Sequence, residues 1–171
     1  IRGVVGWIPL VDPKVDATLE RLSANPRLRG VRHVVQDEPD EMFILGEAFN
    51  GGIEKLKKYE LVYEILIFED HLPQTIEFVD RHPEQVFVLD HLAKPAIWKG
   101  EFVPWRENLA LLARRENVSC KLSGLVTEAD WENWRPEDLT PYLDAALESF
   151  GPTRLMFGSD WPVCRLASEY G

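Results

Sequence analysis

The sequence predicts an α/β fold in which helices cover a parallel sheet, arranged as a (β/α)8 TIM barrel of which about six β/α units are present. Three observations lead to this prediction. Short β-rich runs alternate along the chain with segments of helical periodicity. The β-rich runs are continuously apolar, as in parallel strands that are buried on both faces. Polar side chains follow several of these runs, where the active sites of barrels form.

The elements follow one another without long linkers or low-complexity segments, so we expect a single domain over residues 1–171. Turn-forming pairs such as Asn25-Pro26 and Gly151-Pro152 separate the elements. The runs that we interpret as strands are Gly3–Leu10, Gly30–Val35, Leu61–Phe68, Val86–Asp90, Val118–Leu122 and Arg154–Phe157. The segments that we interpret as helices are Ala17–Leu22, Ile53–Lys58, Gln74–Arg81, Trp105–Arg115 and Leu139–Phe150.

An open doubly wound sheet would also fit this alternation, but it should offer a glycine-rich phosphate turn after an early strand. Gly3 and Gly6 lie within a strand, and Gly51-Gly52 precedes a helix without a strand before it. Neither pair forms a phosphate loop. A barrel instead predicts polar or aromatic residues just past several different strands, and the sequence has them: Trp7, Arg32, His33, His91, Lys94, Ser123, Asp160 and Trp161.

Composition excludes several classes of partner. The formal net charge is −10 at pH 7, and phosphate binding requires clustered Lys and Arg, so we expect neither nucleic acid nor an anionic membrane as partner. No apolar run approaches the roughly 18 residues of a membrane span. Cys120 and Cys164 are too few for a disulfide scaffold, and no signal peptide is evident, so we expect a cytoplasmic protein.

Several motifs together carry a resemblance to a known family. They are "GVRHVVQDEPD" at 30–40, "VLDHLAKP" at 88–95, "CKLSGLVTEADW" at 120–131 and "LMFGSDWPVC" at 155–164. In this order and spacing they resemble the amidohydrolase-2 family of the amidohydrolase superfamily. The resemblance extends over essentially all 171 residues and is strongest to the sugar-lactone and 2-pyrone-4,6-dicarboxylate lactonase-like group.

The resemblance also implies what a complete barrel would add. Members of the family begin with a strand that carries a His-x-His pair, and none of the four histidines here forms such a pair. The six units resemble strands three to eight of a barrel, without the first two strands and the closing C-terminal helix. We therefore expect a fragment that is inactive alone. Its open sheet edges would favour self-association, so a homo-oligomer is an expectation as well.

Asp160 is the first candidate catalytic residue. It follows the apolar run that ends at Phe157, where an isolated Asp would normally cap a helix or form a turn. The resemblance instead implies a general base that takes a proton from water, or a carboxylate that binds a metal. Trp161 follows directly, and with Trp7 it forms a candidate aromatic platform for a sugar ring, although Trp is equally common in protein cores.

His91 is the second candidate, as a donor that polarises a carbonyl or as a metal ligand, and its structural alternative is a hydrogen-bonding residue at a strand end. Alternation along the run 86–90 predicts Phe87, Leu89 and His91 on one face, with the first two partly uncovered in the barrel interior. Asp90 would point the other way and be structural, or it could orient a neighbouring ring. Lys94 could reach a substrate carboxylate or hydroxyl, or be a solvated loop lysine.

Arg32 and His33 are adjacent on one strand, so only one of them can face the barrel interior and contact substrate. Spacing alone leaves the choice open, with a slight preference for His33. Cys120 and Ser123 lack the surroundings of a nucleophile elbow and are poor nucleophile candidates.

Metal use follows from counting ligands. Metal-using relatives take ligands from the His-x-His pair, from histidines after two middle strands and from the final Asp, and here only His91 and Asp160 match. A catalytic zinc site usually needs three protein ligands. We therefore expect either no cofactor or a weakly bound divalent metal such as zinc.

Three functional hypotheses remain. The first is a hydrolase that opens a sugar lactone or a dicarboxylate lactone, with Asp160 as general base. The second keeps the fold and is a metal-dependent decarboxylase or hydratase acting on an organic acid. The third is a non-catalytic, truncated or degenerate barrel. The first hypothesis is favoured because opening an ester ring needs less electrophilic assistance than cleaving an amide.

Overall fold

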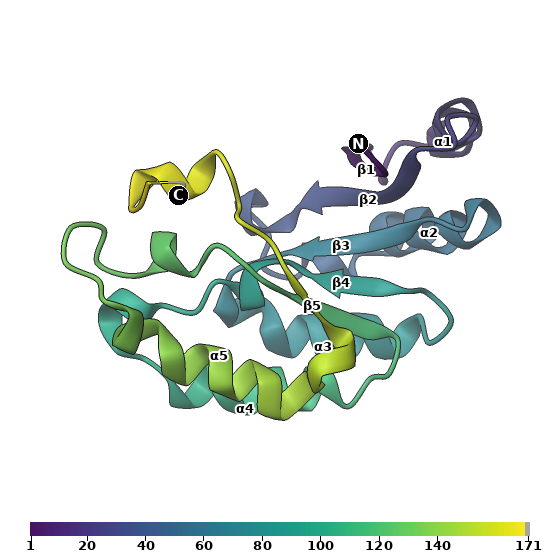
Figure 1. Ribbon diagram of the computed structural model, residues 1–171. Coiled ribbons are helices and arrows are strands. Elements are labelled where there is room, and N and C mark those ends of the chain that lie inside the picture. The colour runs from purple at the N-terminus through teal and green to yellow at the C-terminus, as the bar shows by residue number, and fades with distance from the viewer. Residues whose placement is uncertain (170–171) are drawn as a thin grey trace.

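The computed structural model describes residues 1–169 and contains one six-stranded parallel sheet (Figure 1). The strands are β1 (Val4–Trp7), β2 (Leu28–Val34), β3 (Val62–Leu66), β4 (Phe87–Leu89), β5 (Val118–Leu122) and β6 (Leu155–Phe157). Each strand pairs with the next one along the chain, in the order β1-β2-β3-β4-β5-β6. A doubly wound sheet would reverse its strand order, so this topology confirms the prediction of consecutive barrel units.

Each predicted helix is present, and most of the helices are longer than the segment predicted from the sequence. The helices are α1 (Val15–Ser23), α2 (Glu47–Leu56), α3 (Leu72–Arg81), α4 (Val103–Ala113) and α5 (Pro136–Phe150). Helices α3, α4 and α5 lie along one side of the central strands (Figure 1). A proline stands in the first turn of α3, α4 and α5, where its missing N–H breaks no helical hydrogen bond. No helix in residues 1–169 has the length and hydropathy of a membrane span.

The glycine pair in α2 corrects one expectation. Gly51 and Gly52 lie inside the helix rather than before it, because α2 already begins at Glu47. A Cβ on Gly52 would come within 2.2 Å of the Leu10 carbonyl oxygen. The glycine therefore allows the helix to pack against the segment that follows β1.

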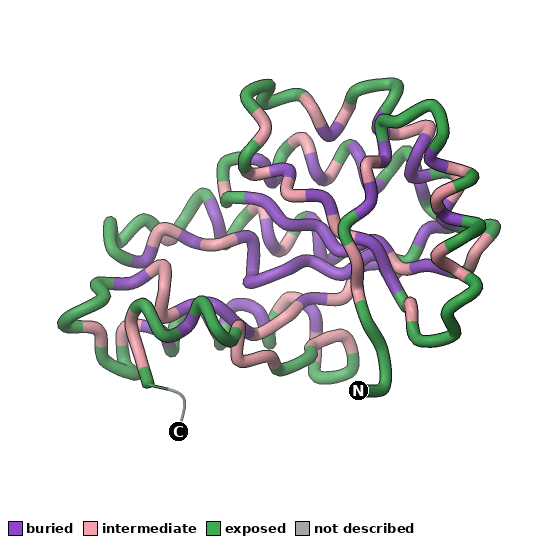
Figure 2. The backbone as a smooth tube through the Cα atoms, turned by 90° about the horizontal axis from the view of Figure 1, so that it is seen from above, coloured by how far each residue is buried: buried purple, intermediate pink, exposed green. Residues whose placement is uncertain are grey.

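The hydrophobic core fills the space between the sheet and its helices, and the buried backbone is concentrated in the central strands (Figure 2). Tyr63 of β3 is paired with Phe87 of β4, and the Phe87 ring packs on Phe78 of α3 with 5.3 Å between centroids. Phe87 and Leu89 are fully buried on this helix-covered side. The expectation that they line the barrel interior was therefore wrong.

The opposite side of the sheet, which we call the inner face, carries charged side chains instead. Arg32 of β2 is paired with Glu64 of β3, so the two residues project from the same face. Lys121 of β5 projects toward the same place and contacts Glu64. Asp90, in the loop directly after β4, contacts Arg32 and Lys121 on this face, so the inner face adjoins the loops at the carboxyl ends of the strands.

Candidate active site

The candidate active site lies beyond the carboxyl ends of β4, β5 and β6. These strands are neighbours in the sheet, so the loops that follow them meet. The β4 loop contributes His91, the β5 loop contributes Ser123 and Gly124, and the β6 loop contributes Asp160. Two residues that are 69 positions apart in the numbering, 91 and 160, are thereby brought together.

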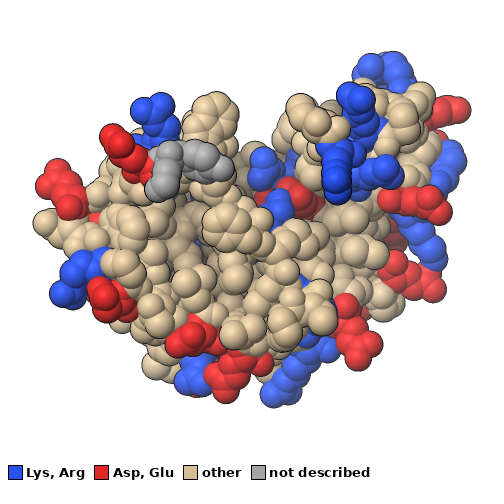
Figure 3. All heavy atoms as spheres, in the orientation of Figure 1, with Lys and Arg blue, Asp and Glu red and all other residues tan. Residues whose placement is uncertain are grey.

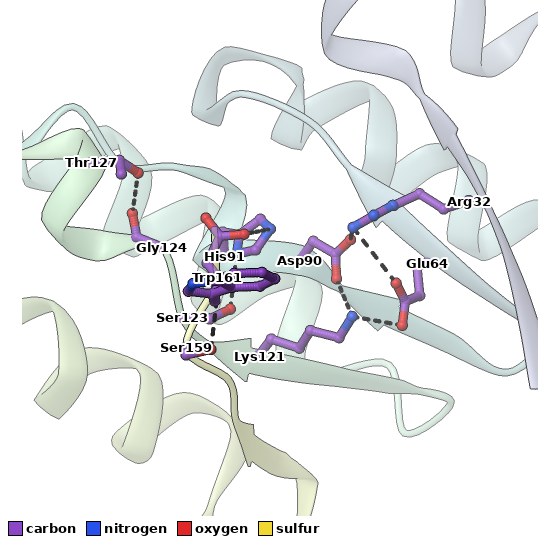
Figure 4. A network of polar contacts seen from close by, with 11 residues as sticks. Arg32, Glu64, Asp90, His91, Lys121, Ser123, Gly124, Thr127, Ser159 and Trp161 are labelled. Carbon is purple, nitrogen blue, oxygen red and sulfur yellow. Dashed lines mark hydrogen bonds and ion pairs between the residues drawn. The ribbon is translucent and has the colours of Figure 1, made fainter. Parts of the chain in front are cut away.

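His91 and Asp160 face each other directly. The distance from His91 Nε2 to Asp160 Oδ1 is 3.6 Å, and both side chains are mostly shielded from solvent, with exposed fractions of 9% and 18%. The other ring nitrogen of His91, Nδ1, lies 2.8 Å from the Ser123 hydroxyl (Figure 4). Burial lowers the pKa of His91 against the opposing effect of Asp90 and Asp160. At neutral pH the ring is therefore a neutral imidazole whose Nε2 side is directed at Asp160.

A left-handed turn of the backbone aims the His91 ring. His91, Leu92, Ala93 and Lys94 have φ angles of 52°, 54°, 58° and 50°, although none of them is glycine. The left-handed conformation costs L-residues roughly 1–2 kcal/mol each, so the turn stores strain that its surroundings must balance. Strained backbone of this kind is concentrated at functional sites. The turn also ends β4 at Leu89, so His91 does not continue the alternation of the strand.

Gly124 provides the space in which the His91 ring lies. Its φ angle is 70°, a conformation that favours glycine. A Cβ at this position would lie 2.8 Å from His91 Nδ1 and 3.0 Å from Cγ of the same ring. Both the backbone conformation and the close approach therefore require glycine here.

Asp160 is also in a left-handed conformation, with a φ angle of 55°. The backbone N–H of Gly158 donates to the Leu122 carbonyl at 3.2 Å, and that of Cys164 donates to the Asp160 carbonyl at 3.0 Å. These bonds tie the β6 loop to β5 and to the turn after Asp160. The carboxylate is consequently held at the site rather than free in solvent.

Four charged side chains form a closed network on the inner face, between β2 and β5 (Figure 4). Asp90 is completely buried and accepts a 2.9 Å hydrogen bond from Arg32 Nη1, while its second oxygen lies 2.7 Å from Lys121 Nζ. Lys121 Nζ also lies 2.6 Å from Glu64, and Arg32 lies 3.9 Å from it. Burial and the neighbouring Asp90 raise the pKa of Glu64. The two positive and two negative groups compensate one another.

Arg32 and His33 lie on opposite sides of β2. Arg32 is on the inner face, whereas His33 is buried on the helix-covered side, where it packs on Phe43 at 5.0 Å and bonds to Glu38 at 2.6 Å. Only one of the two faces the interior, as alternation predicts, and it is Arg32 rather than the slightly preferred His33. Trp7 lies beside His33 at 6.2 Å and is more than half exposed.

The remaining candidates lie at the rim of the site. Trp161 is 63% exposed, and Figure 4 shows its ring close to His91 in the view. In residues 1–169 no aromatic contact joins it to Trp7, so the two rings do not form one stacked platform in the structure. Lys94 Nζ lies 5.1 Å from the centre of the Phe68 ring, a cation–π contact at the end of the β3 loop.

The residues that the sequence did not favour as catalytic groups occupy other positions in the structure. Burial raises the pKa of the Cys120 thiol far above its ordinary value, so this cysteine is not a nucleophile. His71 and His82 stand at the two ends of α3. Ser123 has a place that the sequence did not reveal, since its hydroxyl contacts the His91 ring.

Sequence reasoning missed the charged network almost entirely, although a signal was present. Glu64 and Lys121 are each the single charged residue of their strand. A charge in a strand that is buried on both faces requires a partner. Asp90, expected on the opposite face, joins them on the inner face.

Two side chains of the site are of types that bind a divalent metal. His91 Nε2 and Asp160 Oδ1 converge, and the contact of Nδ1 with Ser123 is the kind of bond that orients a histidine ligand. Within residues 1–169, however, no group of three or more His, Cys, Asp and Glu side chains could hold a metal ion. The described residues therefore supply two ligands and do not make a zinc site by themselves.

The molecular surface is hollowed between the C-terminal segment and the β1 side, at the top of Figure 3, and charged atoms of both signs lie in this hollow. Elsewhere on this face acidic and basic side chains are distributed around the edge.

Comparison with known proteins finds relatives in one family, the amidohydrolases. The family model described as amidohydrolase matches residues 1–171. The chain is 45% identical to the L-fucono-1,5-lactonase of Burkholderia multivorans, in an alignment that covers 99% of this chain and 60% of that protein. It is 38% identical to the L-fucono-1,5-lactonase of Burkholderia ambifaria, covering 100% of this chain and 59% of that protein. The chain thus spans about 60% of the length of these curated relatives.

Solved structures agree with the sequence relatives. A crystal structure of an amidohydrolase from Burkholderia multivorans with bound HEPES superposes with a TM-score of 0.93 at 44% identity, covering 99% of this chain and 62% of that chain. A second crystal structure of an amidohydrolase from the same organism, with bound zinc, has a TM-score of 0.90 at 46% identity and the same coverage.

Proposed function

We propose that this chain, which belongs to the amidohydrolase family, comes from an enzyme that opens the ring of a lactone by adding water. The observation that carries the proposal is the approach of His91 Nε2 to Asp160 Oδ1 at 3.6 Å, above the ends of two strands of one sheet. The names of the curated relatives from two Burkholderia species, both lactonases, support the same reaction.

In this proposal Asp160 is the general base. Its carboxylate takes a proton from a water molecule while the water oxygen forms a bond to the lactone carbonyl carbon. The 3.6 Å separation from His91 Nε2 is longer than a hydrogen bond, so the two groups are not tied to each other. Each can therefore address a different atom of one reacting centre.

His91 stabilises the charge that develops on the carbonyl oxygen. In this proposal Nδ1, 2.8 Å from the Ser123 hydroxyl, is the acceptor of that hydrogen bond, so the single proton of the neutral ring lies on Nε2 and can be donated to the oxyanion. Arg32 lies on the same side of the sheet, where its charge is balanced by Asp90 and its guanidinium can serve as a hydrogen-bond donor. When the tetrahedral intermediate collapses, the ring C–O bond breaks and the proton on Asp160 passes to the departing alkoxide. The product is the open hydroxy acid.

The charge balance of the inner face supports a neutral sugar lactone over a dicarboxylate lactone. Arg32 and Lys121 are already paired with Glu64 and Asp90. A substrate with two carboxylates would have to compete with these partners for the cations. A polyol ring instead needs hydrogen-bond donors, and the partly exposed Arg32 guanidinium retains N–H groups for its hydroxyls.

The test uses the full-length enzyme with L-fucono-1,5-lactone, the compound in the names of the relatives, and with 2-pyrone-4,6-dicarboxylate. Ring opening is followed by proton release against the spontaneous rate. We expect kcat/KM for the sugar lactone to exceed that for the dicarboxylate by at least about tenfold, the factor that corresponds to 1.4 kcal/mol. A protein that accelerates neither reaction would contradict the proposed lactone hydrolysis and leave the decarboxylase or hydratase and the non-catalytic barrel as the remaining hypotheses.

A chelation experiment addresses the metal-dependent alternative. Because opening an ester ring needs little electrophilic assistance beyond a hydrogen-bond donor such as His91, we propose that ring opening survives treatment with a chelator. Loss of ring opening on chelation, with recovery on adding zinc, would instead show that the hydrolysis requires a metal. Conversion of an organic acid in place of a lactone, dependent on a metal, would favour the decarboxylase or hydratase.

A further inference from the structure

The left-handed turn His91–Lys94 has to be held in place by its neighbours, because a run of non-glycine residues does not adopt this conformation without support. Its own hydrogen bond runs from the Lys94 N–H to the His91 carbonyl at 2.8 Å. Leu92 and Ala93, in the middle of the turn, are completely buried. The turn is therefore embedded in the protein rather than exposed as a loop.

Trp105, which is not part of the turn, forms a hydrogen bond to the backbone in the middle of it. Its indole Nε1–H donates to the Leu92 carbonyl at 2.7 Å. Trp105 belongs to α4, on the helix-covered side, and is only 2% exposed. The indole is itself held by the Tyr142 ring at 5.1 Å and the Phe102 ring at 5.8 Å. A rigid aromatic group thus supports the carbonyl next to His91.

A second anchor lies just beyond the turn. The backbone N–H of Ala96 donates to Glu69 Oε2 at 2.9 Å. The segment from His91 to Ala96 is therefore tied at a carbonyl by Trp105 and at an amide by Glu69. Neither side chain contacts the His91 ring, so both can act on it only through the backbone.

We propose that Trp105 is a positioning residue of the active site, and that its indole N–H holds the left-handed turn which directs the His91 ring at Asp160. The kinetic part of this inference rests on the proposed lactone hydrolysis, whereas the positioning of the ring does not. Trp105 does not touch the reacting atoms. Its effect is expected on the geometry of His91 and, through it, on turnover.

The experiment compares Trp105→Phe with Trp131→Phe in the full-length enzyme. Phe keeps an aromatic ring at position 105 and removes the N–H donor. Trp131 is the control, since its Nε1–H also donates to a backbone carbonyl, that of Thr127 at 2.8 Å, but its side chain is exposed and its partner is outside the turn 91–94. Ring resonances of ¹⁵N-labelled histidine are recorded for both variants, with the His91 signals assigned by their loss in His91→Asn.

Trp105→Phe is expected to shift or broaden the His91 ring signals while those of His33, His71 and His82 stay in place. It should also lower kcat by roughly 10- to 100-fold with KM nearly unchanged, since misplacement by about 1 Å can cost 100-fold. Trp131→Phe should change neither. If Trp105→Phe does not fold, a 3-benzothienylalanine at position 105, which has the shape of Trp without the N–H, takes its place.

Unchanged His91 signals and unchanged kcat in the folded variant at position 105 would overturn the proposal. So would a uniform shift of all four histidine signals of this chain, because that pattern indicates a general structural loss. If the wild-type enzyme opens no lactone, the histidine signals still decide the positioning role, and that failure belongs to the proposed function alone.

Discussion

Replacing Gly124 with alanine should separate backbone strain from displacement of His91. Gly124 and Gly100 have nearly the same left-handed φ angles, 70° and 69°. A Cβ at Gly124 would lie 2.8 Å from His91 Nδ1, whereas a Cβ at Gly100 would meet nothing within 4 Å. Gly100→Ala therefore imposes the same backbone conformation on alanine without touching the site.

The magnitudes follow from these contacts. The left-handed conformation should destabilise each variant by roughly 1–2 kcal/mol. For a protein of this size, 1 kcal/mol lowers Tm by about 2–4 °C. In Gly124→Ala the ring must also move, since real Cβ atoms do not approach other atoms to 2.8 Å. A displacement of about 1 Å at a catalytic group can reduce kcat by about 100-fold.

The assay is the lactone-opening rate of both full-length variants, with thermal melting on the same preparations. We expect similar decreases in Tm, near-normal kcat for Gly100→Ala and a large decrease in kcat for Gly124→Ala. Equal and near-normal turnover in the two variants would refute the claim that the position of the His91 ring matters for the reaction.

Three further predictions concern the surroundings of the site. Asp90→Asn breaks a buried ion pair and should lower the free energy of unfolding, measured by urea titration, by roughly 3–5 kcal/mol. Asp80→Asn breaks an exposed ion pair and should lower it by less than about 1 kcal/mol. Burial lowers the pKa of His82, so the unfolded chain binds more protons than the folded one and stability is lost as pH falls through about 6.5. His82→Gln should reduce the slope of the free energy of unfolding against pH in this range, and an unchanged slope would contradict this. Ser123→Ala should lower kcat roughly fivefold, as expected for losing a neutral hydrogen bond of about 1 kcal/mol to the His91 ring, and unaltered turnover would show that the hydroxyl does not orient it.

The strands and helices could be predicted because each depends on local patterns of apolar residues. Every β-rich run contains a strand, and the boundaries differ by a few residues, as at α2, where the helix includes Gly51 and Gly52. The order of the strands was also predictable, since consecutive parallel units without a phosphate loop favour a barrel.

The faces of β4 were mispredicted for a physical reason. Alternation along the sequence assumes that the strand continues through His91, but the chain enters a left-handed turn after Asp90. The ring of His91 therefore leaves the side on which Phe87 lies. A turn of this kind, built from residues other than glycine, depends on distant contacts such as that of Trp105, and no local pattern announces it.

The pairing of the charged groups could have been anticipated only in part. A lone charge inside an apolar strand indicates a buried partner, as at Glu64 and Lys121, but which partner it meets depends on strand register. The approach of His91 and Asp160 likewise follows from the neighbouring positions of β4, β5 and β6 in the sheet.

The most direct measurement of the central claim is the lactone-opening rate of Asp160→Asn in the full-length enzyme, with thermal melting on the same sample. Asn keeps the size of the side chain and also tolerates the left-handed backbone at this position, where φ is 55°. If Asp160 is the general base, kcat should fall by about 10²–10⁴-fold with little change in Tm. A variant that melts early but keeps wild-type kcat would show that Asp160 serves the turn after β6 and not the reaction.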